Sequence, residues 1–235
     1  MLRSLNEKVP LIMKIALSSA LTLLLAAVFI FADYKKRYKL AAALKLAASG
    51  MFTVTGILSS AAASEPVMAR MVVSGLFFGA LADELHALRF VFEKARKALF
   101  IIGTLVFLAG HVFYIIAIIR LTWKPLLCIC TGTVLSTVVI CIMNKILSLT
   151  PALKAAGFSY AVIITVMLTT AAANAFASPC RFTTDFAIGA VLFFTSDIIL
   201  VLNSSGKRRT PAGRTANLGL YYMAQTLIAA SLRLL

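Results

Sequence analysis

The sequence predicts an all-α integral membrane protein, a single bundle of eight transmembrane helices. Its 235 residues are 61% hydrophobic and only 13% charged, whereas soluble domains carry about a quarter charged residues. Apolar runs of about 20 residues, the length that crosses a bilayer core as a helix, recur along the whole chain. They leave no segment for a separate soluble domain, so residues 1–235 are expected to form one domain. A β-barrel would show short segments of alternating hydrophobicity instead.

Charged loops and loops that contain Pro, Gly or Ser separate the apolar runs and set the limits of each helix. The first run is longer than a typical signal-peptide core and lacks a clear A-x-A cleavage site, so we expect a retained span. The clearest breaks are DYKKRYK (33–39), RFVFEKARK (89–97) and NSSGKRRTPAGR (203–214). The predicted helices cover residues 9–32, 39–61, 67–89, 98–120, 124–146, 155–177, 184–203 and 215–234.

The net charge of +15 predicts the orientation of the bundle in the membrane. Fourteen Lys and Arg residues lie in the loops after the first, third, fifth and seventh helices, and eight lie on the other side. Because cytoplasmic loops carry the excess of basic residues, both termini are expected on the non-cytoplasmic side. Topology and anionic lipid headgroups explain these charges, so no nucleic acid is expected as a partner. We expect a multi-pass protein of the bacterial inner (cytoplasmic) membrane.

Five polar side chains from five predicted helices share one depth. At 1.5 Å per residue, Lys45, Asp83, Tyr160, Asp197 and Tyr222 all lie about 7–11 Å inside the cytoplasmic boundary. A charged group at this depth costs several kcal/mol unless it is paired or hydrated, so the two aspartates favour a functional site. For Lys45, snorkelling to the interface is an alternative, and the tyrosines alone would fit an aromatic belt.

Further polar groups follow helical spacing. His111 and Tyr114 are three residues apart and share a helix face, although His111 lies about 20 Å from the cytoplasmic end by residue rise. A hydrogen bond across the bundle and a functional role are both open for this histidine. Tyr222 and Gln225 form a similar stripe, which we expect to point inward. A G-x-x-x-G pattern that starts at Gly75 predicts close approach of a neighbouring helix.

The motifs of metal and nucleotide chemistry are missing from the sequence. There are two histidines, His86 and His111, without an H-E-x-x-H pattern, and the four cysteines lack the spacing of a metal site. The sequence contains no G-x-S-x-G elbow, P-loop or G-x-G-x-x-G. We therefore predict no metal and no cofactor. The remaining chemistry is that of two carboxyl groups with Tyr, Gln and Lys around them.

Four stretches resemble the YhhN-type lysoplasmalogenase family. They are GLFFGALADELHAL (75–88), GTLVFLAGHVFYIIAI (103–118), GAVLFFTSDIILVL (189–202) and YYMAQTLIAASL (221–232). The G-x3-F-x3-H-x2-Y pattern and the L-F-F-x-S-D pattern, which contains Ser196, are specific together. Ala82 stands where the family has glycine before the first aspartate.

The resemblance implies an eight-helix hydrolase that cleaves the vinyl ether of lysoplasmalogens to a fatty aldehyde and a glycerophospho-base, without a metal. The family's conserved aspartates would correspond to Asp83 and Asp197, and its partners would be a lysophospholipid, water and the surrounding membrane lipids. Those two residues are the predicted catalytic groups. The predicted substrate-binding residues are Lys45, His111, Tyr114, Tyr160, Ser196, Tyr222 and Gln225.

This chemistry suits the residues. Vinyl-ether hydrolysis begins with protonation of the β-carbon, and water then attacks the oxocarbenium ion, as at the two carboxyl groups of a glycosidase. One of two crowded carboxyl groups in an apolar bundle can keep a proton near neutral pH, and the sequence leaves open which one. Tyr160, Tyr222 and Gln225 could position water or the ether oxygen. Lys45 could bind the phosphate of a lipid that enters from the cytoplasmic leaflet.

Two other classes of function also fit. In a proton-coupled transporter of lipids or small solutes, the carboxylates would form a proton relay, together with inverted repeats or broken helices. The segments GLFFGALAD (75–83) and GAVLFFTSD (189–197) share G-x7-D, but their helices run in the same direction and give no inverted repeat. In a non-catalytic membrane interaction protein, the polar residues would only join helices.

Overall fold

The described residues of the protein fold into eight α-helices. The computed structural model describes residues 2–146, 151–205 and 210–235, and the side chains of 9–146, 158–203 and 210–235. No strand occurs within the described residues. A 3₁₀ turn follows α3 (η1, Glu93–Ala95) and another follows α8 (η2, Leu232–Leu234). The helices are α1 (Leu2–Tyr34), α2 (Tyr38–Ser60), α3 (Pro66–Leu88), α4 (Arg96–Ile119), α5 (Pro125–Ile146), α6 (Pro151–Ala177), α7 (Arg181–Ser205) and α8 (Pro211–Ser231).

The predicted all-α architecture is confirmed, and its helix limits agree within a few residues except at the start of α1. Seven helices, α1 to α7, are long and apolar enough to cross a membrane by length and composition. In the described part of the chain α8 does not meet this criterion, although eight spans were predicted. The helix is more polar than the others and buries Asn217 and Gln225. The side of the membrane on which the termini lie stays a prediction.

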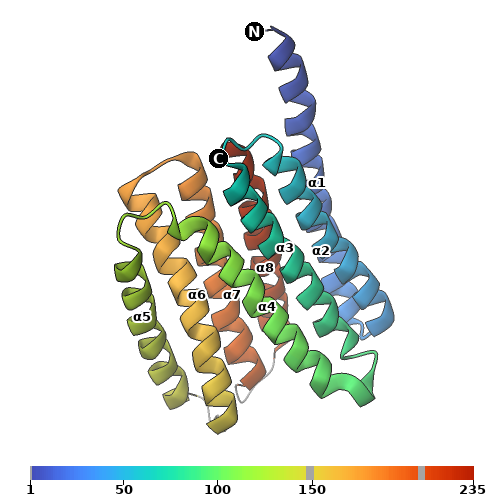
Figure 1. The fold of residues 1–235 in the computed structure, drawn as a ribbon. Coiled ribbons are helices and arrows are strands. Elements are labelled where there is room, and N and C mark those ends of the chain that lie inside the picture. The colour runs from blue at the N-terminus through green and yellow to red at the C-terminus, as the bar shows by residue number, and fades with distance from the viewer. Residues whose placement is uncertain (1, 147–150, 206–209) are drawn as a thin grey trace.

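α8 lies within the bundle and packs both against α7 and against the first two helices of the chain. Consecutive helices pack in pairs, α1 with α2, α3 with α4, α5 with α6 and α7 with α8, and α8 also packs against α1 and α2. Figure 1 shows α5 at one edge of the bundle and α1 at the other. The α1–α2 and α3–α4 loops and the C-terminal ends of α5 and α7 all lie at one end, and the C-terminus lies at the other. We call the first of these the basic-loop end.

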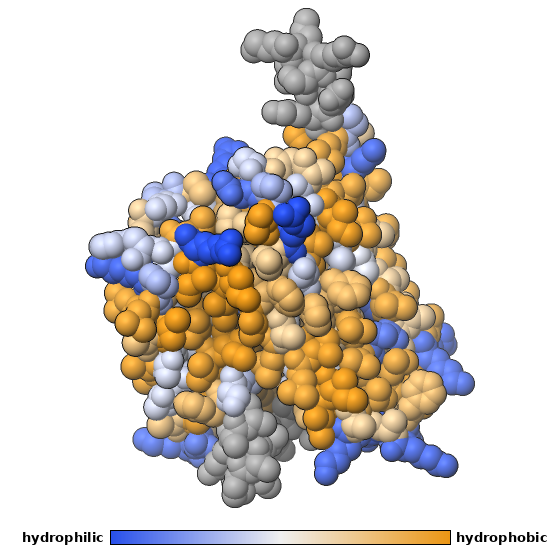
Figure 2. All heavy atoms as spheres, in the orientation of Figure 1, coloured by the Kyte–Doolittle hydropathy of each residue, from blue (hydrophilic) through white to orange (hydrophobic). Residues whose placement is uncertain are grey.

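The outer surface suits a lipid environment. Figure 2 shows a broad apolar band across the face in view, with hydrophilic residues above and below it. Large apolar side chains such as Leu17, Leu105 and Val134 are more than half exposed. A soluble monomer rarely exposes apolar surface on this scale, because the hydrophobic effect disfavours it. The protein is therefore an integral multi-pass membrane protein.

Glycines bring α3 and α4 into backbone contact. A Cβ atom added at Gly75 would overlap the ring of Tyr114 and lie 2.9 Å from the carbonyl oxygen of Gly110. A Cβ added at Gly110 would lie 3.0 Å from the carbonyl oxygen of Gly75. The close approach predicted from the G-x-x-x-G pattern is confirmed, because only a hydrogen atom fits at this contact. The contact also fixes Tyr114 against α3.

We expect Gly75→Ala to destabilise the bundle by about 1–3 kcal/mol, because the added methyl group meets a backbone oxygen that cannot move aside. The matched control is Gly50→Ala on α2, where nothing lies within 4 Å of the added Cβ. There alanine should be neutral or stabilising by up to about 1 kcal/mol, because it favours the helix over glycine. Thermal unfolding of both variants in detergent tests the contact, and equal unfolding temperatures would contradict it.

Candidate active site

The carboxyl group of Asp83 on α3 is surrounded by hydrogen-bond donors. Its side chain is buried, and its Oδ1 lies 2.8 Å from the Nζ of Lys45. Its Oδ2 accepts hydrogen bonds from Ser49 Oγ at 2.6 Å and from Tyr221 Oη at 2.8 Å. One cation and two hydroxyl donors together stabilise the ionised form of a carboxyl group. The geometry therefore identifies Asp83 as a carboxylate.

Helix α2 supplies two of these donors because Lys45 and Ser49 are four residues apart and share a face. Lys45 is only 8% exposed, and its ammonium group lies 5.6 Å from the centroid of the Phe29 ring. The lysine side chain is therefore buried and directed at Asp83. Lys45 was predicted from the sequence and Ser49 was not, although the same helical spacing identifies it.

A directed chain of hydrogen bonds reaches Asp83 from α4 and α8. Tyr114 Oη donates to Gln225 Oε1 at 2.8 Å, and Gln225 Nε2 donates to Tyr221 Oη at 3.3 Å. Tyr221 in turn donates to Asp83. Tyr222 Oη lies 3.1 Å from Ser49 Oγ, and it is the donor there because the Ser49 hydroxyl proton is directed at Asp83. Four residues of α4 and α8 are thus oriented by one carboxylate.

Asp197 of α7 has a much poorer set of partners. It is also buried, and Tyr160 Oη of α6 donates to its Oδ2 at 3.0 Å. Within the described residues its side chain has no other hydrogen bond and no ion pair. A buried carboxyl group without a cation is costly in its charged form, so the neutral acid is the favoured state in this position. The two aspartates therefore differ in their surroundings.

Phe107 of α4 lies between the two aspartate environments. Its ring centroid is 6.1 Å from that of Tyr160, the partner of Asp197, and 6.1 Å from that of Tyr221, a partner of Asp83. Phe193 of α7 packs against Phe107 at 5.7 Å and against Tyr221 at 5.5 Å. We call these four rings the aromatic layer. Among the described side chains no hydrogen bond joins the two carboxyl groups. The aromatic layer therefore lies between them and contacts the partners of both.

His111 borders the aromatic layer with an unused nitrogen. Its ring centroid lies 4.8 Å from that of Phe107 and 4.6 Å from that of Phe193, and the residue is 1% exposed. Its Nδ1 is 2.9 Å from the carbonyl oxygen of Phe107, and since a carbonyl only accepts, Nδ1 carries the proton. Nε2 is then an acceptor in the neutral ring, and it has no partner among the described groups.

Ser196 holds α7 to α8 rather than contacting either aspartate. Its hydroxyl donates to the carbonyl oxygen of Asn217 at 2.9 Å. Asn217 Nδ2 donates to Ser196 O at 2.9 Å and to Ser196 Oγ at 2.8 Å. Ser196 was predicted to bind substrate, and its partner Asn217 was not predicted from the sequence. The reciprocal pair fixes the rotation of α7 at the residue next to Asp197.

A hollow of about 450 Å³ lies elsewhere, at the far end of the bundle. It is lined by the α4–α5 loop at Leu121, the α6–α7 loop and start of α7 at residues 178–183, and the C-terminal residues 234–235. Asp197 lies sixteen residues further along α7 than Arg181, which is about 24 Å along the helix. The hollow is therefore separate from the Asp197 carboxyl group.

Comparison with known proteins bears on the whole chain. The sequence model of the YhhN family matches residues 11–232, a stretch that includes both aspartates, their hydrogen-bond partners and the aromatic layer. Searches of curated proteins and of solved structures gave no match. Because the matched stretch covers nearly all of the 235 residues, the chain belongs to the YhhN family.

Proposed function

We propose that the protein is a lysoplasmalogenase, a membrane hydrolase that converts a lysoplasmalogen and water to a fatty aldehyde and glycerophosphoethanolamine or glycerophosphocholine. Membership of the YhhN family supports the activity. The single observation that carries the mechanism is the contrast between two buried carboxyl groups, Asp197 with one hydroxyl partner and Asp83 with a cation and two hydroxyl donors.

Asp197 is the acid in this proposal. Its neutral carboxyl group gives its proton to the β-carbon of the vinyl ether, and the double-bond electrons form the new C–H bond. The positive charge that results is shared by the α-carbon and the ether oxygen. The faces of the aromatic layer stabilise such a cation, since the ring quadrupole attracts positive charge. The carboxylate of Asp83 adds a longer-range attraction for the same charge.

Water completes the reaction. The water oxygen bonds to the α-carbon and releases a proton to Asp197, which is a carboxylate after the first step. The hemiacetal that results then collapses: its hydroxyl group loses a proton and becomes the aldehyde carbonyl, the bond between the α-carbon and the glycerol oxygen breaks, and a proton goes to the glycerol oxygen. One water molecule is consumed, and the reaction involves no net oxidation or reduction. His111 Nε2, a buried acceptor beside the layer, holds the attacking water in this scheme.

Aldehyde release from purified protein in deuterated water tests the proposal. Proton transfer to the β-carbon predicts one deuterium at carbon 2 of each aldehyde, trapped by rapid reduction to the alcohol. In ¹⁸O-labelled water the glycerol product should retain its unlabelled oxygen, because the bond to the α-carbon breaks. The control substrate is the saturated 1-alkyl lysophospholipid, which has no double bond to protonate and should remain intact.

Two results would contradict the proposal. Aldehyde without deuterium at carbon 2 would exclude protonation at carbon. Absence of aldehyde release, combined with lipid-coupled proton flux in vesicles, would favour the transporter.

A further inference from the structure

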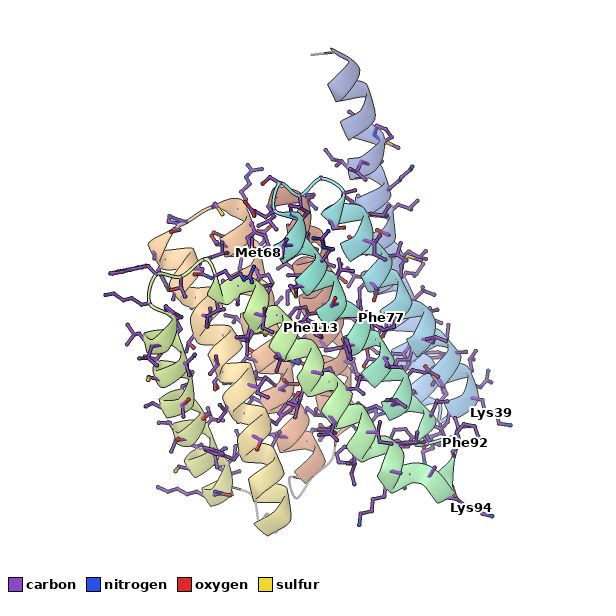
Figure 3. All side chains as sticks on the ribbon, in the orientation of Figure 1. Lys39, Met68, Phe77, Phe92, Lys94 and Phe113 are labelled. Atoms are coloured by element: carbon purple, nitrogen blue, oxygen red, sulfur yellow. The ribbon has the colours of Figure 1, made fainter. Side chains whose placement is uncertain are left out.

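Three arginines converge on one phenylalanine at the basic-loop end. The guanidinium carbons of Arg89, Arg96 and Arg214 lie 4.8, 5.6 and 5.6 Å from the centroid of the Phe90 ring. They come from the end of α3, the start of α4 and the first turn of α8. Figure 3 shows the α3–α4 connection, marked by Phe92 and Lys94, at this end of the bundle beside Lys39. We call these three residues the arginine cluster.

Aromatic rings hold the cluster in place. The guanidinium carbon of Arg89 also lies 5.0 Å from the centroid of the Phe100 ring, and Tyr38 stacks on Phe90 with a centroid distance of 5.5 Å and an interplanar angle of 18°. A guanidinium that stacks on a ring keeps its N–H groups free at its edge for an anion. The Nε of Arg89 is buried and has no hydrogen-bond partner among the described groups. This N–H group of Arg89 is therefore shielded from solvent, and its hydrogen-bonding capacity is not satisfied by any described group.

The positive charge of the cluster is only partly balanced. Arg214 donates two hydrogen bonds to the carboxylate of Asp33, from Nε at 2.5 Å and from Nη2 at 2.9 Å. Among the described side chains no carboxylate forms an ion pair with Arg89 or Arg96. Burial, with the nearby charges of Arg214 and Arg96, lowers the pKa of Arg89 to about 10, so it stays charged at neutral pH. Two cations thus remain available to an anion.

The position of the cluster relative to the aspartates matches one class of anion. Arg89 follows Asp83 by six residues, which is about 9 Å along α3. In a lysoplasmalogen seven bonds join the phosphorus to the β-carbon of the vinyl ether, roughly 8 Å at about 1.2 Å per bond in an extended chain. A phosphate at the cluster would therefore place the vinyl ether at the level of the aromatic layer.

From this geometry we infer that Arg89, Arg96 and Arg214 form the binding site for the phosphate of the lysophospholipid headgroup. The inference rests on the proposed function. It moves the phosphate away from Lys45, whose charge is already balanced by Asp83. Arg89 and Arg96 donate hydrogen bonds to the phosphate oxygens, and Arg214, held by Asp33, adds the third positive charge.

A binding assay separates this site from turnover. The probe is 1-O-alkyl lysophosphatidylcholine, which is not hydrolysed, and the matched probe without phosphate is 1-O-alkylglycerol. Wild-type protein should prefer the phosphate probe by at least about tenfold, because hydrogen bonds between charged groups are strong. Arg89→Gln and Arg96→Gln should each remove most of that preference and leave alkylglycerol binding unchanged. Arg89→Lys, which keeps the charge but loses the planar fork, should have an intermediate effect.

The matched control is Lys97→Gln, which removes an exposed cation of the same loop next to Arg96 and should leave the preference unchanged. Arg96 is exposed, so its substitution tests the site even where Arg89→Gln fails to fold. A wild-type preference in both glutamine variants would overturn the inference. Displacement of the probe by millimolar inorganic phosphate as readily as by the lipid would also overturn it, because the site would then be one for free phosphate.

Binding and turnover can fail separately. Arginine-dependent binding in a protein that releases no aldehyde would leave the phosphate site standing and refute the proposed function. Aldehyde release that is equally efficient in wild type, Arg89→Gln and Arg96→Gln would support the proposed function and refute the phosphate site. Where both hold, the glutamine variants should raise KM about tenfold or more, with kcat changed less than about threefold, because the phosphate is bound equally before and during the reaction.

Discussion

Asp197→Asn is expected to reduce aldehyde release by a factor of about 10²–10⁴, the usual contribution of a positioned general acid. The substitution keeps the size of the side chain and can still accept the hydrogen bond from Tyr160, but it removes the transferable proton. Folding should be preserved, because Asp197 forms no ion pair among the described residues. The measurement is the rate of aldehyde formation under single-turnover conditions, with thermal unfolding as a check on folding.

Asp185→Asn provides the matched control, since it is the same substitution on the same helix, twelve residues before Asp197. It should leave both aldehyde release and the unfolding temperature at their wild-type values. Wild-type turnover in a folded Asp197→Asn variant would exclude this residue as the acid and would remove the mechanistic basis of the proposed function.

Asp83→Asn is expected to destabilise the protein by about 3–5 kcal/mol, because it leaves the buried ammonium group of Lys45 without its counter-charge. For a chain of this size the corresponding fall in Tm is roughly 10 °C. Aldehyde release should also be lost. These two effects must be separated, since an unstable protein is inactive whatever its chemistry.

The double variant Lys45→Met with Asp83→Asn makes the separation. Replacing both members of a buried ion pair by uncharged groups avoids the unpaired charge, so the double variant should regain most of the lost stability. It should nevertheless remain inactive if the Asp83 carboxylate stabilises the cation in the reaction. Recovery of turnover together with stability would assign the Lys45–Asp83 pair a purely structural role.

Residue rise predicted the layer of polar groups but could not give their pairing. Lys45 and Asp83 were expected at one depth, and they form an ion pair. Tyr160 and Asp197 were expected at the same depth, and they form a hydrogen bond. Depth along a helix says nothing of its rotation or of which neighbour it faces, and this is why the sequence left the acid unassigned. The surroundings of each carboxyl group, seen only in three dimensions, support an assignment.

One physical reason explains why two partners of Asp83 were not predicted from the sequence. Ser49 lies four residues after Lys45, and Tyr221 directly precedes Tyr222. Serine and tyrosine are also common in ordinary helix packing, so neither residue stood out. Spacing of four residues, from Lys45 to Ser49 and from Tyr221 to Gln225, would have been the usable signal. His111 was expected deeper than the aspartates, yet it packs against Phe107 and Phe193. Helix α4 crosses the bundle obliquely, so residue rise overestimates its depth (Figure 1).

The polar character of α8 has a consequence for biosynthesis. This helix follows seven more apolar ones and is not apolar enough to be recognised as a span by composition. We therefore expect its entry into the membrane to depend on packing against α1, α2 and α7, which leaves Asn217 and Gln225 buried. Since α8 supplies Tyr221, the hydrogen-bond network around Asp83 is completed only when this helix docks. The candidate site is thus complete only when α8 is packed in the bundle.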